Sequence, residues 1–329
     1  MRIGLIAILV FAGFVAPARA APRCEEACLS AILDKYLAAM VAHDTDAAPL
    51  ARDIRFSEND VMLQPGDGLW ATIDGIEPGK ELRFFDPEKG EIGYLGVVTE
   101  HGLGSYLMAR MTVRSGRIAE VETLVHRKEP GPGIDPKLYE PDPEVARLLT
   151  PEERTPRAKM IALADGYFST LQLNDGTMHT VFDPDCQRAE NGLLTAGKPS
   201  AAQPKLSGCA HQLEMGELKR ITAARDRAYF AVDERRGLIM ARIFLDHDGF
   251  LSEYKRTDGT TMSAAPHTVP QTWCALELFK IVNGRIRRIH ATMTGVPYKL
   301  PTPWGPSRVV PRGPFTPASA IFLDKGGKR

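Results

Sequence analysis

The chain has 329 residues, of which 43% are hydrophobic and 25% charged, a composition typical of a globular protein with room for two domains. Lysine plus arginine and aspartate plus glutamate each total 41, so the formal net charge is zero. This balance, and the lack of a basic cluster interleaved with aromatic residues, argues against a nucleic-acid partner.

The N-terminus has the pattern of a secretory signal peptide. A single positive charge at Arg2 precedes a largely apolar stretch over 3–15, and Ala18-Arg19-Ala20 is a small-x-small cleavage site. We expect cleavage after Ala20. The apolar stretch is shorter than the ~20 residues that a permanent membrane anchor needs. We therefore expect a periplasmic or secreted protein with no membrane partner after cleavage, the alternative being an uncleaved membrane tether.

Five cysteines in an exported chain are typical of one or two disulfides and a remaining thiol. Cys186 and Cys209 lie in polar, loop-like surroundings, and we expect them to pair. Cys24 and Cys28 lie at the start of a predicted helix, where they can pair if the first turn is frayed. Cys274, inside an apolar run, is expected to be a buried free thiol. No two cysteines have the two-residue spacing of a zinc site, so no metal is expected.

In the first half, apolar residues recur at three- and four-residue steps over 25–42, which predicts an amphipathic helix. After a charged segment at 55–60, apolar runs separated by glycines predict strands over 92–99, 105–114 and 118–127. Ser115-Gly116 is the expected hairpin turn between the last two strands.

The segment 129–156 contains seven prolines, which predicts a linker or a strap over the surface. A second helix is predicted over 157–173. The strands predicted after it cover 218–224, 228–232, 238–245, 274–282 and 286–293. Asn283-Gly284 is the expected turn of the last hairpin.

The two halves share a pattern of residues in the same order. The matches are Asp34-x-Tyr36 with Asp165-x-Tyr167, Glu58-Asn59 with Glu190-Asn191, and Gly116-Arg-Ile with Gly284-Arg-Ile. We interpret the pattern as a tandem duplication with a longer second copy. The domains expected are a signal peptide (1–20), a first domain (24–128), a linker (129–156), a second domain (157–298) and a proline-rich tail (299–329).

Several strings in this pattern carry a resemblance to known families. They are Phe56–Asn59, Gly68–Trp70, Phe182–Cys186, Glu190–Gly192, Arg225–Arg227 and Glu277–Lys280. With the order of the elements, they resemble the SnoaL-like branch of the nuclear-transport-factor-like superfamily, and an uncharacterised family of secreted bacterial and fungal proteins. The resemblance implies an α+β fold of two tandem cone-shaped domains, each with N-terminal helices packed on a curved antiparallel sheet. Its members include proton-transfer enzymes and binding modules, so the fold leaves the function open.

Proton transfer in such a pocket needs a carboxylate or histidine, and a donor for the developing oxyanion. In the second domain we expect Glu190 or His290 to move the proton and Tyr167 to be the donor. Each residue also has a structural interpretation. Glu190 could form an ion pair between helix and sheet, His290 could be a satisfied core histidine, and Tyr167 could be packed in the core.

Other polar residues are candidates for binding the substrate. Arg188 and Asn191 flank Glu190, and Arg225 and Arg227 could present guanidinium groups from the edge of a strand. A solvated loop is the alternative for the two arginines. The segment 246–248 has the residue types of metal ligands, but adjacent side chains point apart, so we expect a turn.

The chain lacks a Gly-x-Ser-x-Gly elbow, a phosphate-binding loop and a dinucleotide fingerprint, so we expect no cofactor. We expect a lyase, dehydratase or isomerase that acts by proton transfer on a small apolar or aromatic substrate. The alternative is a non-catalytic periplasmic ligand-binding or scaffold protein. An open second cone would favour the enzyme, and a packed cone the alternative. The two domains are expected to pair as an intrachain pseudo-dimer.

Overall fold

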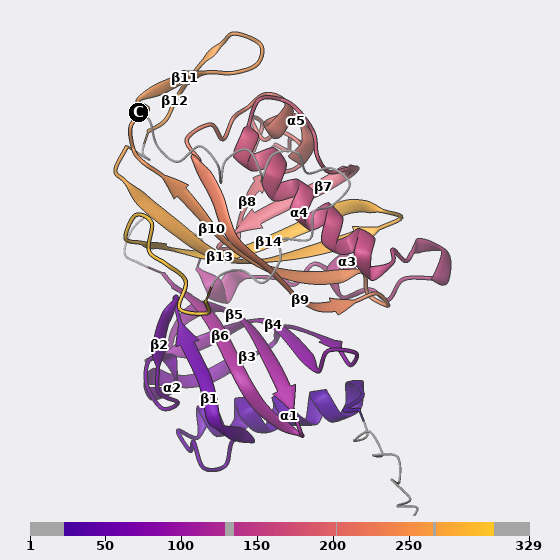
Figure 1. Ribbon diagram of the computed structural model, residues 1–329, viewed down its shortest axis with the longest axis vertical. Helices are drawn as coiled ribbons and strands as arrows, with labels where there is room; N and C mark the ends of the chain where they lie inside the picture. The colour runs from indigo at the N-terminus through magenta and orange to yellow at the C-terminus, as the bar shows by residue number, and fades with distance from the viewer. Residues whose placement is uncertain (1–22, 129–134, 202, 266–267, 306–329) are drawn as a thin grey trace, which may run out of the picture.

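The computed structural model describes residues 23–128, 135–201, 203–265 and 268–305. The signal peptide predicted from the sequence lies outside these residues, as does most of the predicted tail. Within the described ranges, no helix is long and apolar enough to cross a membrane. The described residues form two sheet-rich halves, one above the other in Figure 1.

The first domain consists of one long helix, one short helix and a six-stranded sheet of order β2-β1-β6-β5-β4-β3. The elements are α1 (Glu26–Val41), β1 (Leu50–Glu58), β2 (Val61–Leu63), α2 (Leu69–Thr72), β3 (Ile73–Asp86), β4 (Glu91–Glu100), β5 (Leu103–Arg114) and β6 (Arg117–Arg127). The apolar stripe of α1 forms one buried cluster with residues of the strands. This burial orients the helix along the sheet.

The second domain has a sheet of the equivalent order, β8-β7-β14-β13-β10-β9. Its elements are α4 (Arg157–Leu173), β7 (Phe182–Glu190), β8 (Leu193–Ala196), α5 (Cys209–Glu214), β9 (Ala223–Asp233), β10 (Leu238–His247), β13 (Gln271–Val282) and β14 (Arg285–Val296). A small hairpin of β11 (Glu253–Lys255) and β12 (Thr261–Ser263) projects from the sheet (Figure 1).

Both sheets are mixed, which corrects the expectation of antiparallel sheets. The first strand of each domain runs parallel to the last, β1 with β6 and β7 with β14. The other pairings within the two sheets are antiparallel. In each domain a meander of four strands brings the last strand back beside the first, in the same direction. Such a return is a long-range feature that local sequence patterns do not show.

The remaining differences from the predicted elements are local. The strand predicted over 218–224 is wrong for 218–222, because β9 begins only at Ala223. The segment 246–248 is only partly a turn, since β10 extends to His247. The linker contains short helical turns: η1 (Pro136–Leu138), α3 (Pro143–Ala146) and η2 (Pro151–Glu153). The buried ammonium of Lys280 fastens the linker by donating a hydrogen bond to the carbonyl of Arg147 at 2.7 Å.

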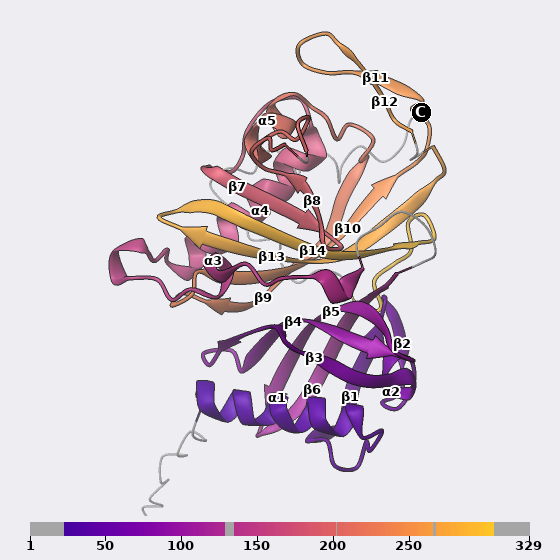
Figure 2. The ribbon, with the colours of Figure 1, turned by 180° about the vertical axis from the view of Figure 1, so that it is seen from behind.

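The outer faces of the two sheets pack against each other (Figure 2). The shared apolar cluster includes Phe84, Leu95, Met108 and Leu124 from the first domain and Met240, Phe244, Leu276 and Leu278 from the second. A buried ion pair crosses the same interface, with Arg242 of β10 lying 3.2 Å from Glu122 of β6. Arg110, on β5, binds the same carboxylate at 2.7 Å. Charged and apolar groups therefore both hold the two domains together.

The structure contains two disulfides, Cys186–Cys209 and Cys24–Cys28, while Cys274 is a buried free thiol. Both pairs are those considered from the sequence. Disulfides are typical of proteins that fold in oxidising compartments outside the cytoplasm.

Candidate functional site

A row of paired residues crosses the sheet of the second domain and places two carboxylates on one face. Glu277 in the middle of β13 pairs with Ala241 of β10 and with Ala291 of β14, and Ala291 in turn pairs with Glu190 of β7. Directly paired residues point to the same face of a sheet. Ala241 belongs to the apolar cluster under α4, so this is the face of the sheet that lies toward α4.

Glu277 is 2% exposed, and its Oε2 atom has no hydrogen-bond partner among the described residues. Burial raises its pKa to about 8, with a further increase from the Glu190 carboxylate and a decrease from the Arg188 guanidinium. A carboxylate oxygen that is buried without a partner is costly, so the neutral acid is favoured. Glu277 therefore holds a proton at neutral pH.

Tyr167 projects from α4 into the same interior. Its ring makes edge contacts with Phe182 and Phe279, at centroid distances of 6.2 and 5.4 Å. Burial raises the pKa of its hydroxyl well above 10, and the nearby Glu277 carboxyl raises it further, although Arg188 lowers it. The hydroxyl consequently remains a hydrogen-bond donor.

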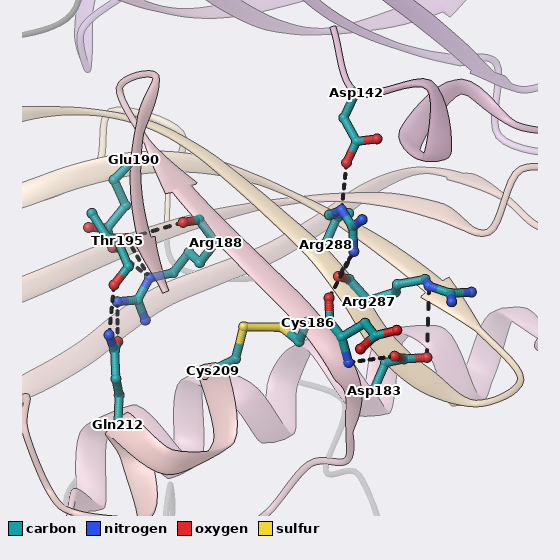
Figure 3. Close-up of a disulfide and its surroundings, with 11 residues drawn as sticks. Asp142, Asp183, Cys186, Arg188, Glu190, Thr195, Cys209, Gln212, Arg287 and Arg288 are labelled. Carbon is teal, nitrogen blue, oxygen red and sulfur yellow. Dashed lines mark hydrogen bonds and ion pairs between the residues drawn. A yellow bond between two sulfur atoms is a disulfide. The ribbon is translucent and has the colours of Figure 1, made fainter. Parts of the chain in front are cut away.

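Arg188 is fixed on three sides, as Figure 3 shows. Its Nε lies 3.1 Å from Glu190 Oε1 and donates to Thr195 Oγ1 at 3.1 Å, and its Nη2 donates to Gln212 Oε1 at 2.8 Å. Burial would lower its pKa, but the negative charge of Glu190 and a hydrogen bond with Tyr167 raise it above the usual value. The Cys186–Cys209 disulfide ties β7 to α5, the helix that carries Gln212. The result is a rigid, permanently positive group beside Tyr167.

The first domain shows what the fold requires at the position of Glu277. Following the same route across its sheet, Glu58 pairs with Thr123 and Thr123 pairs with Ala109. Ala109 is 1% exposed and belongs to the apolar core. The first domain thus carries a small apolar side chain at the place in its sheet where the second domain carries an acid.

His290, on β14, points to the opposite face of the second sheet from Glu190, on β7. It pairs with Leu278, which belongs to the cluster between the domains, and it lines a narrow space there with Tyr106 and Tyr139. Burial lowers its pKa to about 4, although Asp142 raises it. The structure therefore does not bring His290 to Tyr167 or Glu190, because adjacent residues of a strand point to opposite faces.

Arg225 and Arg227 lie on β9 and not in a solvated loop. The bulge at Asp226, whose φ is 54°, turns the two side chains to opposite faces. Arg227 donates inward to Asp165 Oδ1 at 3.1 Å, and Arg225 donates outward to Asp246 Oδ2 at 2.8 Å. Both guanidinium groups are thus engaged by the protein itself.

Asn191 also has a structural position. Its side-chain amide donates to the Met293 carbonyl at 3.0 Å and accepts from the Met293 amide at 2.9 Å. Asn59 makes the same pair of hydrogen bonds to Val125 in the first domain. Of the residues expected at the site, the structure brings Glu190, Arg188 and Tyr167 together.

The sequence reasoning missed Glu277 as a chemical group. The signal that could have found it is a glutamate at an inward position of the apolar run over 273–282. Two cavities that lie among the described residues are both away from the interior between α4 and the second sheet. One is the narrow space beside His290, and the other is an open groove between α1 and β3.

A model of the family described as a domain of unknown function, DUF8021, matches residues 153–293. A search of curated proteins found no match. Among solved structures, the chain is similar to a de novo designed protein with a curved β-sheet, at 13% identity over 31% of this chain and 87% of that one, with a TM-score of 0.27.

It is also similar to an NTF-2-like protein of unknown function from Burkholderia xenovorans LB400, at 16% identity over 36% of this chain and 97% of that one, with a TM-score of 0.27. AclR from Streptomyces galilaeus shares 15% identity over 32% of this chain and 82% of its own, with a TM-score of 0.26. Each likeness covers about a third of the chain, and the candidate site rests on the side chains described above.

Proposed function

We propose that the second domain acts on a small, largely apolar or aromatic molecule by proton transfer, without a cofactor, as a lyase, dehydratase or isomerase. The observation that carries the proposal is Glu277. This acid is buried without a partner for Oε2, at a position where the first domain carries Ala109. A carboxyl kept in an apolar interior at a cost in free energy is characteristic of acid–base sites.

The surrounding groups fit this chemistry. A general acid or base is most effective when its pKa is near the working pH, and burial raises the pKa of Glu277 to about 8. The hydroxyl of Tyr167 and the positive charge of Arg188 would stabilise negative charge that develops on a substrate oxygen. Glu190, through its ion pair, holds Arg188 in place. We further propose that the protein works in the periplasm or outside the cell.

One observation favours the second candidate, a non-catalytic binding protein. Tyr167, Phe182 and Phe279 pack together by ring-to-ring contacts in the buried interior of the second domain. A packed interior has little space for a substrate to move through a reaction. In this case the protonated Glu277 would donate a hydrogen bond to a bound ligand and would transfer no proton.

The test is to incubate the purified mature protein with apolar ketones and phenols in deuterated buffer, and to follow hydrogen exchange at carbon by NMR. We expect enzyme-dependent exchange with at least one compound. Glu277→Gln should lower its rate about 10²–10⁴-fold, the usual contribution of a general acid or base.

His290→Gln is the matched control, because this half-buried side chain lies on the other face of the same sheet, and it should leave the rate unchanged. Full activity of Glu277→Gln would contradict the assigned residue. Saturable ligand binding without exchange would favour the binding protein.

A further inference from the structure

The two disulfides differ in their access to solvent. Cys186 and Cys209 are 3% and 2% exposed. In contrast, Cys28 is exposed and Cys24 is half-buried at the start of α1. A thiolate must reach a sulfur atom in order to break a disulfide, so access decides which bond reacts. Within the described part of the chain, the Cys24–Cys28 bond is the accessible one of the two.

This bond also holds a helix start that has little other support. The residue before the first turn of α1 is Glu25, whose side chain makes no capping hydrogen bond. Helices that begin without a capping side chain fray more readily. Cys24 packs against the core of the first domain, so the bond from Cys28 to Cys24 anchors the first turn to that core.

The first turn of α1 also contacts the second domain. Glu26 binds Arg235 at 2.7 Å and Arg236 at 3.1 Å, both in the turn between β9 and β10. These pairs join segments that are 209 and 210 residues apart in sequence. Fraying of the first turn would therefore release a contact between the two domains.

We propose that Cys24–Cys28 is a thiol–disulfide exchange site that opens while the rest of the protein stays folded, and that its opening frees Glu26 from the second domain. A thiolate of a dithiol attacks the exposed Cys28 sulfur. The electron pair of the broken S–S bond goes to Cys24, which leaves as a thiolate and takes up a proton. The second thiol of the reagent then displaces Cys28, so the reagent becomes a disulfide and the protein gains two thiols.

Differential alkylation tests the first part of the proposal. The native protein is treated with dithiothreitol at pH 8, quenched with iodoacetamide at intervals and analysed by peptide mass spectrometry, with circular dichroism recorded in parallel. We expect Cys24 and Cys28 to be labelled at least tenfold faster than Cys186 and Cys209, with an unchanged spectrum. Labelling of all four at one common rate would overturn the proposal.

Hydrogen exchange tests the second part. Reduction should increase amide exchange over residues 25–29 and in the turn around Arg235, and the double variant Cys24→Ser, Cys28→Ser should match the reduced protein without any reductant. Glu26→Gln, which keeps the disulfide, should increase exchange only in the turn. Unchanged exchange in the turn around Arg235, in both the reduced protein and the double variant, would overturn the coupling.

Discussion

At the scale of single residues, Glu277 is a buried acid at a place where the first domain carries an alanine. The fold accepts an alanine at this place, as Ala109 shows in the first domain. The carboxyl of Glu277 lies in the apolar interior without a partner for Oε2, an arrangement that opposes folding whenever the group is charged. The proposed proton transfer would account for this carboxyl, and its cost in stability can be measured.

Stability should fall as the pH rises from about 5 to about 9. The folded protein keeps the Glu277 proton up to a pKa of about 8, whereas the unfolded chain loses it near 4.5. The stabilisation is therefore complete below pH 4.5 and is lost as the pH passes through 8. Since one pKa unit corresponds to about 1.4 kcal/mol, the loss is on the order of a few kcal/mol.

Urea denaturation at several pH values measures this dependence, and Glu277→Gln should remove part of it. A remainder is expected from Asp60, whose pKa burial likewise raises to about 8, with a further increase from Glu122. An unchanged pH profile in Glu277→Gln would show that this carboxyl ionises normally.

At the scale of elements, two asparagines close equivalent turns. Asn59 between β1 and β2, and Asn191 between β7 and β8, both adopt a φ of 48°. Each side chain bonds to the backbone of the last strand of its domain. The asparagine of the Glu-Asn pair that occurs in both halves therefore has a structural role. It fastens the first hairpin of its domain to the sheet. The tandem duplication itself stays a prediction.

Replacing either asparagine with alanine should cost about 1–3 kcal/mol of unfolding free energy, because two partly buried backbone groups lose their partners. The costs for Asn59→Ala and Asn191→Ala should be similar, as measured by chemical denaturation. Glycine at the same positions also lacks the bonds but tolerates a positive φ, so it should be less destabilising than alanine. An alanine variant as stable as the wild type would show that the side-chain bonds contribute nothing.

At the scale of the whole molecule, the interface between the sheets combines an apolar cluster with buried charge. Glu122 accepts bonds from Arg110 of its own domain and from Arg242 of the other. The segment after β14 adds a second link. Trp304 stacks on Arg55 and Arg110 of the first domain, and Arg225 of the second domain donates to the Leu300 carbonyl at 2.8 Å. The two domains are therefore expected to unfold together.

Glu122→Gln should weaken this cooperation, because it leaves two buried guanidinium groups without their shared carboxylate. The expected cost is about 3–5 kcal/mol, with calorimetry showing two transitions in place of one. Arg114→Gln is the control, since its ion pair with Glu120 is exposed and should contribute about 0–1 kcal/mol. A single transition at the wild-type temperature in Glu122→Gln would refute a role for the buried pair.

The elements that the sequence predicted well are those whose signal is local. The helices expected over 25–42 and 157–173 correspond to Glu26–Val41 and Arg157–Leu173, since their apolar periodicity arises from one buried face. The last hairpin of each domain also lies where its turn residues predicted it. β3 was missed, because glycine, proline and charged residues interrupt its apolar pattern.

The candidate site was predicted only in part, because local sequence patterns do not show which residues meet across the sheet. Glu190 and Tyr167 stood out at positions matched in the first half, and Arg188 as a charge beside Glu190. The structure places the three together. The strand register decided the rest. It put His290 on the far face, turned Arg225 and Arg227 apart at a bulge, and set Glu277 between two alanines. The sequence by itself determined the helices, the hairpins and the repeated Glu-Asn pair, because these depend on neighbouring residues. Only the tertiary structure decided which carboxyl is buried, because burial depends on strands that are far apart in the chain.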